Sequence, residues 1–297
     1  MRHTRHMLTM RETHTAFDTC HPAVPATYFA ATILIAIFAM QPVCVGISLA
    51  GALAFSLAAR GWRRTLGGLR WQLPMVALVA VANPLFSASG STLVAQLGPM
   101  AIYQESIAYG ACAGALLVTV VLWFEDAACV LTQDRLLQLG ARALPTVTLV
   151  TSMAAQLVPQ LMQRSQTVRA ATLATTAAAP EGSRARGVRV ADQLMSWSME
   201  DSIERSDAMR ARGWGATDRR SCYLPDSFRN SDAFALAGIA LLAAASAFLV
   251  YVACSQWHFY PTMPRLVAWW GYVPYVALAL LPTALDLGQR LRWGRIA

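Results

Sequence analysis

Residues 196–215, which read SWSMEDSIERSDAMRARGWG, decide how the rest of the chain is interpreted. Apolar and small residues recur there every three or four positions, which predicts an amphipathic helix. Asp201 and Arg205 are four residues apart, so we expect an ion pair on the helix surface. Arg210 and Arg212 fall in the last turn, where cations favour the helix dipole, and Gly213 follows as a left-handed cap. Taken alone, the segment fits either an ordinary capped helix or an arginine tip that docks into an acidic groove of a partner.

The composition places this helix in a membrane protein. Of 297 residues, 56% are hydrophobic and 13% are charged, whereas soluble domains carry about a quarter charged residues. The apolar residues come in long runs, which predicts an all-α, polytopic membrane protein with about six transmembrane helices. All 24 basic residues are Arg. They flank apolar runs rather than aromatic stacking platforms, so the net charge of +8 does not indicate nucleic-acid binding.

Six apolar runs define the expected spans: 26–40, 43–59, 71–87, 106–124, 233–254 and 266–285. Residues 87–104 between the third and fourth runs read as a loop, because they contain Gly and Pro. Arginine concentrates at 60–70, within 125–232 and after 290. By the positive-inside rule, both termini and residues 125–232 are expected in the cytoplasm.

The expected organisation therefore has four parts. Residues 1–25 form a cytoplasmic tail, 26–124 form four spans, 125–232 form a cytoplasmic region, and 233–297 form two spans and a basic tail. Aromatic residues between the last two spans are typical of a membrane-interface belt; they are Trp257, Phe259, Tyr260, Trp269 and Trp270.

The cytoplasmic region carries 13 Arg and 12 Asp or Glu, so its charges nearly cancel. A surface that binds lipid headgroups would be basic, and this balance favours contact with proteins. Two long helical patterns fill the region. The first begins near Pro145 and runs to about Ala179, and a breaker follows at Pro180–Ser183. The second contains the segment quoted above.

Motifs for catalysis or for metal binding are absent from the sequence. No G-x-S-x-G, P-loop or H-E-x-x-H stretch occurs, and the six Cys are scattered without C-x-x-C spacing. The N-terminal His3, His6 and His14 lack carboxylates at ligand spacing and read as part of a solvated tail. Charge inside the spans is almost absent, with Glu105 and Asp286 at span edges. We therefore expect no cofactor, no metal and no enzymatic activity, so that any energy comes from a partner.

At this point several stretches match a known family. They are His21-Pro22, Asn83-Pro84-Leu85-Phe86, residues 131–134 (LTQD), 197–202 (WSMEDS) and 207–215 (DAMRARGWG). Their order resembles that of the transmembrane T component of energy-coupling factor (ECF) transporters, a family that includes the cobalt-transporter permease subunit. The resemblance extends from about Cys20 to the last span. Its most specific part is the triplet Ala211-Arg212-Gly213, because it ends a long helix before the last two spans.

The resemblance implies a scaffold with two long cytoplasmic coupling helices. Each helix ends in an Ala-Arg-Gly-like motif that docks on one of two ABC ATPase subunits. A membrane-embedded, substrate-binding S component completes an importer for a vitamin or a transition metal. The coupling residues implied in this chain are Ala211, Arg212 and Gly213, together with Arg210, Trp214 and, on the first helix, Arg169. An arginine suits such docking because its planar fork engages carboxylates bidentately and stays charged.

The first coupling motif departs from the family pattern. Counting back roughly forty residues from the second motif leads to Leu173-Ala174-Thr175, which contains no Arg. Ala185-Arg186-Gly187 spells the motif but follows the breaker, and Arg169 lies on the first helix itself. We therefore expect Arg212 to carry more of the ATPase docking than any residue of the first helix.

Other interpretations remain open at this stage. A permease subunit of a conventional ABC importer also couples through cytoplasmic helices, but its short E-A-A---G-type loop is absent here. A membrane-embedded enzyme is disfavoured by the lack of catalytic groups. Small residues at Gly46, Ala50 and Ala54 and at Gly110 and Gly114 lie on common helix faces, which permits close helix approach in lipid. They serve either packing within the chain or a sliding surface for the S component.

Overall fold

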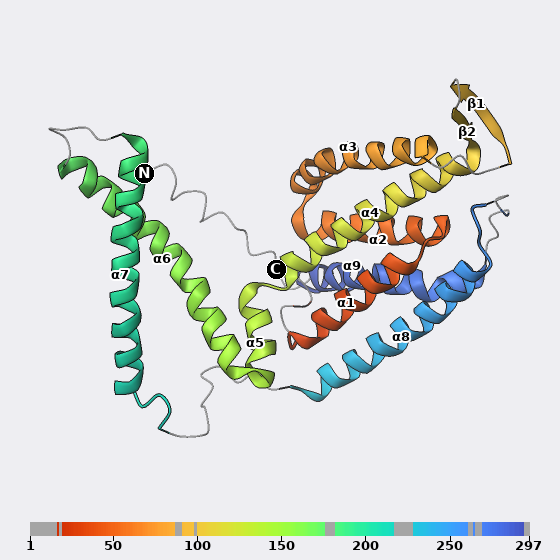
Figure 1. The fold of residues 1–297 in the computed structure, drawn as a ribbon. Coiled ribbons are helices and arrows are strands. Elements are labelled where there is room, and N and C mark those ends of the chain that lie inside the picture. The colour runs from red at the N-terminus through yellow and green to blue at the C-terminus, as the bar shows by residue number, and fades with distance from the viewer. Residues whose placement is uncertain are drawn as a thin grey trace. The chain divides into compact units, whose positions relative to one another are not determined.

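The computed structural model describes residues 17, 20–86, 91–97, 100–175, 182–216, 228–260, 264 and 269–293. Within these residues the chain is helical apart from one short β-hairpin (Figure 1). The chain divides into two compact units. The first, the membrane unit, comprises residues 1–136 and 227–297, and the second, the helical-pair unit, comprises residues 137–226.

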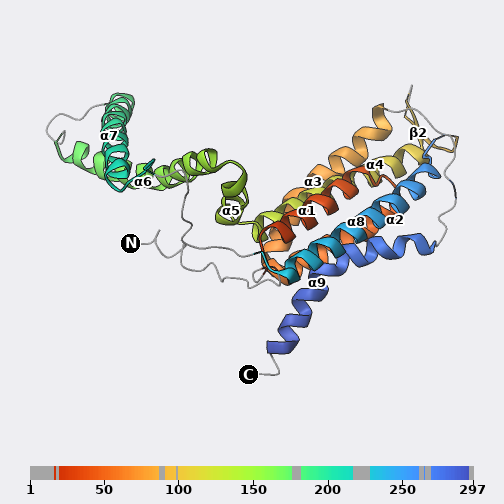
Figure 2. The ribbon, with the colours of Figure 1, turned by 90° about the horizontal axis from the view of Figure 1, so that it is seen from below.

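The membrane unit is a bundle of long helices. Its elements are α1 (Ala23–Phe38), α2 (Pro42–Arg60), α3 (Trp62–Phe86), β1 (Leu93–Leu97), β2 (Met100–Tyr103), α4 (Gln104–Val130), α8 (Asn230–Ser255), the short helix η2 (Trp270–Tyr272) and α9 (Val273–Trp293). Helix α4 packs against α1, α2 and α3, while α9 packs against α2 and α8. Figure 2 shows α1, α2, α3, α4 and α8 running side by side.

Among the described residues, five helices are long and apolar enough to cross a membrane: Pro42–Arg60, Trp62–Asn83, Gln104–Val130, Asn230–Ser255 and Trp270–Gln289. This confirms the predicted all-helical class with several membrane-compatible helices. Helix α1 is apolar but has only 16 residues. At about 1.5 Å per residue it is shorter than a hydrocarbon core of about 30 Å. Five of the six predicted runs therefore meet the length criterion.

The third span begins earlier than predicted. Helix α3 starts at Trp62 instead of residue 71, directly after Gly61, whose φ of +81° permits the sharp turn from α2. Arg63, Arg64 and Arg70 therefore lie on the helix rather than in a loop. A helix tolerates them there because the apolar stem of an arginine covers hydrophobic surface while its guanidinium reaches water.

Other boundaries also differ from the prediction. The interpretation of 87–104 as a loop was wrong for its second half, where β1 pairs antiparallel with β2. Helix α4 does not end at Phe124 but continues to Val130, which brings Glu125 and Asp126 into the helix. Helix α9 begins at Val273 rather than at residue 266.

Aromatic side chains fill the core of the membrane unit. Tyr28 and Trp123 are fully buried, and their rings meet at 6.3 Å between centroids. The polar atom of each side chain also has a hydrogen-bond partner. Tyr28 OH donates to the carbonyl of Leu278 at 2.8 Å, and Trp123 Nε1 donates to Ser48 Oγ at 2.9 Å. These bonds connect α1 to α9 and α4 to α2. Breaking either would leave a buried donor unpaired, which is costly.

Glycines bring α4 close to α3. A Cβ atom at Gly110 would lie 2.9 Å from the carbonyl oxygen of Ala80, and one at Gly114 would lie 3.0 Å from Val76 Cγ1. Both glycines therefore pack closely against α3, which supports the alternative of packing within the chain. Gly46 differs, since no heavy atom lies within 4 Å of its Cβ position.

The helical-pair unit contains α6 (Pro145–Thr175) and α7 (Ser183–Ala211), preceded by α5 (Gln133–Ala143). Helix α5 was not predicted. Helix α6 begins at Pro145 as predicted, while its expected end near Ala179 lies outside the described residues. Helix α7 begins at Ser183, which the sequence had assigned to a breaker.

Candidate coupling site on helices α6 and α7

Helices α6 and α7 form a crossed, antiparallel pair (Figure 1). They have 31 and 29 residues. Arg205 of α7 donates from Nη2 to Gln160 Oε1 of α6. The guanidinium of Arg164 lies 5.2 Å from the centroid of the Trp197 ring, a distance typical of a cation–π contact. Polar and cation–π contacts thus hold the pair together, and no residue of α7 is buried.

The end of α7 has the geometry of a Schellman motif. Gly213 has a φ of +82°, which confirms the predicted left-handed cap. Its N–H donates to the carbonyl of Arg210 at 2.9 Å, and Trp214 N–H donates to the carbonyl of Met209 at 3.0 Å. These two bonds satisfy carbonyls that a helix end leaves unpaired. The turn after the helix is therefore fixed by the backbone.

This turn presents the predicted coupling residues together. Arg210, Ala211, Arg212, Gly213 and Trp214 are all exposed, and 47% of the Trp214 surface is accessible. We call Arg210–Trp214 the arginine tip. Two guanidinium groups and an indole are thus held on a rigid helix end, without burial by the rest of the described unit.

Helix α7 also exposes an apolar stripe. Val188, Met195, Met199 and Ile203 recur at intervals of seven, four and four residues, which places them on one helix face. They are 71%, 69%, 68% and 64% exposed. Exposed apolar surface of this extent is typical of an interaction site. Helix α6 contributes further exposed apolar residues, among them Val147, Val150, Val158 and Met162.

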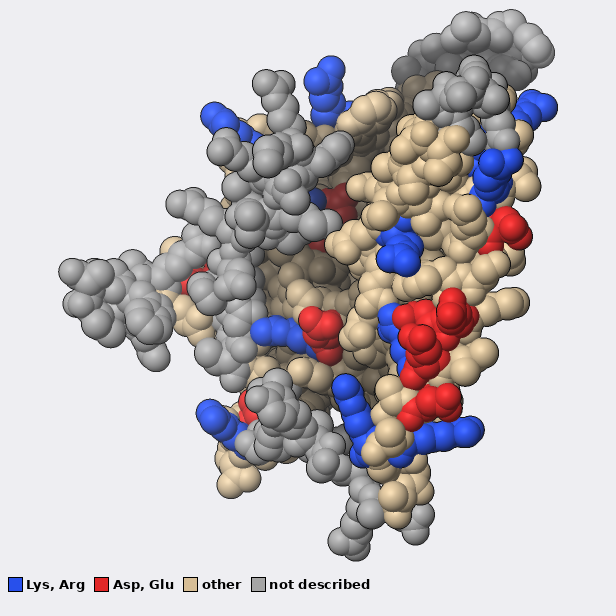
Figure 3. Space-filling model, turned by 90° about the vertical axis from the view of Figure 1, so that its left-hand side faces the viewer, with Lys and Arg blue, Asp and Glu red and all other residues tan. Residues whose placement is uncertain are grey.

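The charges of α7 lie beside this stripe. The predicted ion pair is confirmed, with Arg205 Nε 2.5 Å from Asp201 Oδ2. Figure 3 shows acidic and basic side chains close to one another on the face that it draws. Helix α7 itself carries five Arg and five Asp or Glu, so it has no net charge that would attract an anionic surface.

The two alternatives for the first coupling motif occupy different positions. Ala185-Arg186-Gly187 lies in the first turns of α7, and Gly187 does not have a positive φ. This triplet therefore begins a helix rather than ending one. Arg169 is exposed on α6, six residues before Thr175, the last described residue of that helix. Leu173, Ala174 and Thr175 are also exposed, as the final described turn.

A buried charge cluster in the membrane unit was missed from the sequence. Arg60 Nη1 of α2 lies 2.5 Å from Glu125 Oε2 and 3.8 Å from Asp126 Oδ1 of α4. Gln72 Nε2 of α3 donates to Glu125 Oε1 at 3.0 Å. The Asp126 side chain is completely buried. Because α4 extends past Phe124, these two carboxylates lie on the helix and not in the region after it, where the sequence had placed them. The signal available in the sequence was an Arg and an adjacent acid pair at the ends of two apolar runs.

Glu105 and Asp286, the two acidic residues that the sequence analysis placed at span edges, are also buried. Glu105 Oε1 accepts hydrogen bonds from Ser91 Oγ at 3.0 Å and from Thr92 Oγ1 at 2.9 Å, so it anchors the segment before the β-hairpin. Asp286 is 2% exposed on α9. Among the described residues, no three His, Cys, Asp or Glu side chains are grouped so that they could hold a metal ion.

No protein-family model matches the chain, and no curated protein matches its sequence.

Proposed function

We propose that this chain is the transmembrane T component of an ECF-type ABC importer. The observation that carries the proposal is the arginine tip on α7, rigidly capped and exposed beside an uncovered apolar stripe. A helix that transmits force must hold its contact groups in a fixed position, and the Schellman turn does so. The sequence resemblance in 197–202 and 207–215 falls on this same helix and tip.

The partners of the tip are ABC ATPase subunits. Arg212 offers a planar fork for carboxylates in a groove on an ATPase, and Trp214 offers an amphipathic anchor. Two ATPase subunits bind, one at each coupling helix. The two sites are unequal, because the last described turn of α6 has Leu173, Ala174 and Thr175 in place of an arginine.

The third partner is a membrane-embedded S component that binds the substrate, a vitamin or a transition metal. ATP hydrolysis by the ATPases moves α6 and α7, and the chain passes this motion to the S component. The chain itself is non-catalytic. It lies in the plasma membrane of a prokaryote, with both termini and the coupling helices in the cytoplasm, as the arginine distribution favours.

The proposal is tested by identifying what binds the full chain. The tagged protein is purified from its native cells in a mild detergent, and co-purifying proteins are identified by mass spectrometry. Two ATPase chains and a small hydrophobic membrane protein are the expected result. A periplasmic-type binding protein in their place would favour the conventional ABC permease and contradict the proposal.

Three single variants locate the coupling site. Arg212→Ala should weaken ATPase association more than tenfold, because truncating one partner of a desolvated ion pair costs about 2–5 kcal/mol. Arg169→Ala should have an intermediate effect, and Arg186→Ala, at the opposite end of α7, serves as the matched control with little effect. If Arg186→Ala is as damaging as Arg212→Ala, the tip of α7 is not the principal site.

A further inference from the structure

The first turns of helix α3 carry a cluster of exposed arginines. Arg63, Arg64 and Arg70 lie between the turn at Gly61 and the apolar part of the helix. In the part of the chain that the structure describes, their side chains form no ion pair and no hydrogen bond. The first turn of α3 contains no acidic residue, so the positive end of the helix dipole adds to their charge. This end of α3 therefore carries uncompensated positive charge.

Two acidic residues of α4 lie near this end of α3, and both face Arg60. Glu125 Oε2 is 3.5 Å from the position that a Cβ atom would take at Gly68, but it is also 2.5 Å from Arg60 Nη1. The other oxygen of Glu125 accepts a hydrogen bond from Gln72. Asp126 is completely buried, with Oδ1 3.8 Å from Arg60 Nη1. The three exposed arginines thus remain available to an anion from outside the chain.

A gap in the side chains separates two of these arginines. Arg63, Gly67 and Arg70 follow each other at intervals of four and three residues, so they lie on one face of α3. All three are exposed, and no heavy atom lies within 4 Å of the Cβ position of Gly67. The arginines are about 10 Å apart along the helix axis, at about 1.5 Å per residue, so both side chains can reach an anion above Gly67. The fork of donors on a guanidinium group matches a phosphate group.

The same face becomes apolar further along the helix. It continues through Pro74, Leu78 and Val81, which are all exposed. Trp62 and Trp71, at the two ends of the arginine cluster, are exposed as well, and tryptophan is typical of the headgroup level of a membrane. Helix α3 packs mainly on α4, at the edge of the bundle (Figure 1 and Figure 2). The face therefore presents cations at the headgroup level and apolar surface beyond it.

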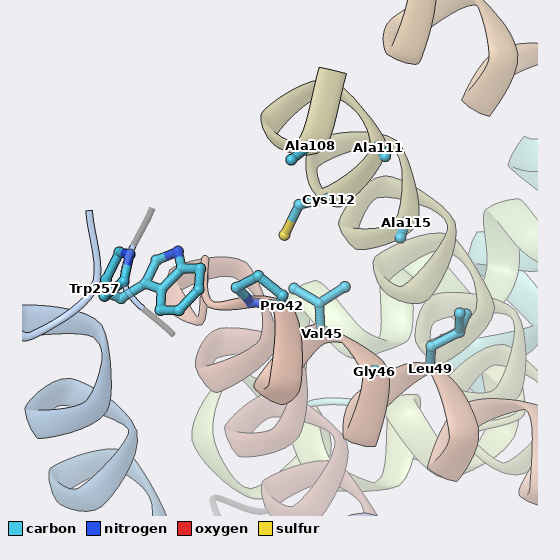
Figure 4. A pocket seen from close by; sticks show the side chains of 10 residues that line it. Pro42, Val45, Gly46, Leu49, Ala108, Ala111, Cys112, Ala115 and Trp257 are labelled. Atoms are coloured by element: carbon cyan, nitrogen blue, oxygen red, sulfur yellow. The ribbon is translucent and has the colours of Figure 1, made fainter. Parts of the chain in front are cut away.

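The groove between α2 and α4 lacks this combination (Figure 4). It has a volume of about 460 Å³, and none of the described residues that line it is charged. Its walls include Pro42 and Gly46, in the first turns of α2, whereas Arg60 is at the opposite end of that helix. No charged group there would select an anion, so the groove provides a control position for the experiments below.

We propose that Arg63 and Arg70 hold the phosphate of an anionic phospholipid above Gly67. The acyl chains of this lipid extend along the apolar part of the same face. By the positive-inside rule, the arginines place this end of α3 in the cytoplasmic leaflet. An acidic segment of a partner protein fits less well, because it would pair with the arginines but leave the apolar part of the face uncovered. The inference does not depend on the proposed transport function.

The first test removes the charges. The full chain is purified in mild detergent, stripped of lipid and titrated with dioleoyl-phosphatidylglycerol, and binding is followed by native mass spectrometry. Arg63→Gln and Arg70→Gln should each weaken binding about fivefold, and the double variant about thirtyfold, because a basic residue near the membrane surface contributes about 1 kcal/mol. Arg184→Gln removes an exposed arginine at the start of α7. It is the matched control and should leave binding unchanged.

The second test closes the gap between the arginines without changing the charge. Gly67→Leu should weaken phosphatidylglycerol binding about fivefold or more, because the leucine separates the phosphate from one of the two guanidinium groups. The helix should tolerate the substitution, since the Cβ position is open and leucine favours a helix over glycine. Gly46→Leu in the groove of Figure 4 is the matched control, because its Cβ position is equally open. It should leave binding unchanged.

Three outcomes would overturn the proposal. Equal affinity of the wild-type chain for phosphatidylglycerol and dioleoyl-phosphatidylcholine would show that the charge of the lipid is not recognised. Wild-type affinity in Gly67→Leu, together with a loss in the double arginine variant, would show attraction by diffuse surface charge instead of a held headgroup. Displacement of the lipid by an equal concentration of inorganic phosphate would show a site for a free anion. If the double arginine variant fails to fold, Gly67→Leu against Gly46→Leu still decides.

Discussion

Replacing Arg60 by alanine should destabilise the membrane unit, because the change removes the cation that compensates two carboxylates. Arg60 Nη1 lies 2.5 Å from Glu125 Oε2 and 3.8 Å from Asp126 Oδ1. The Glu125 side chain is 33% exposed and can regain water, whereas that of Asp126 is 0% exposed and cannot. The cost of the substitution therefore comes mainly from Asp126, whose buried carboxyl group loses its nearest cation.

The magnitude follows from this burial. Removing one partner of a buried ion pair costs about 3–5 kcal/mol. Arg60 is itself 18% exposed and its contact with Asp126 exceeds hydrogen-bonding distance, so we expect the lower end, about 3 kcal/mol. Asp126→Asn keeps the side-chain volume and leaves the Arg60–Glu125 contact, and should cost about 1 kcal/mol. The double variant should be less damaging than the sum of the single variants by about 2 kcal/mol.

The assay is unfolding of the full chain in mixed micelles with a rising mole fraction of dodecyl sulfate, followed by far-UV circular dichroism. Arg64→Ala is the control, because Arg64 is exposed on α3 and its loss should change stability by less than about 0.5 kcal/mol. An Arg60→Ala effect below about 1 kcal/mol, the value of an exposed ion pair, would refute the reasoning. Additive effects in the double variant would refute it as well.

Three further predictions follow from the same structure. Gly213→Ala should weaken ATPase co-purification, because alanine at a φ of +82° costs about 1 kcal/mol, and Gly213→Asn should recover part of the loss since asparagine tolerates this conformation. Gly114→Leu should destabilise the chain by about 1–3 kcal/mol in the same unfolding assay, through overpacking against α3; unchanged stability would contradict the packing role. Reporter fusions after Ser183 should be cytoplasmic and those after His258 external, whereas an external signal after Ser183 would exclude the coupling role.

Local signals in the sequence were sufficient for two of the helix ends. Gln41-Pro42 marked the start of α2 to within one residue, and Gly213 marked the end of α7. In both cases the backbone itself decides the boundary, through the fixed φ of proline and the left-handed freedom of glycine. The β-hairpin was missed although two apolar runs flank Gly98-Pro99, a pattern that favours a hairpin. The Gly and Pro content was taken as a loop signal instead.

The buried charge cluster could not be predicted with the same methods. Glu125 and Asp126 come directly after Phe124, and a pair of carboxylates after an apolar run reads as the end of a span. Whether they are buried depends on Arg60, 65 residues away in the chain, and on Gln72 of a third helix. Such pairing is a property of tertiary packing, and hydropathy along one segment does not contain it.

The exposed apolar stripe on α7 could contact either a partner protein or the bilayer, and the charges of the helix distinguish the two. Helix α7 has five Arg and five Asp or Glu among its 29 residues. Insertion into the hydrocarbon core would cost about 2.5–3.5 kcal/mol for each charge near the centre, so the helix does not cross a membrane. A helix that lies on the membrane surface carries mainly basic residues on its polar face, where they attract anionic lipids. Here the two signs are equal in number, and that attraction is absent. Under the proposed function, the stripe of Val188, Met195, Met199 and Ile203 would be covered by an apolar protein surface whose rim pairs with both signs of charge.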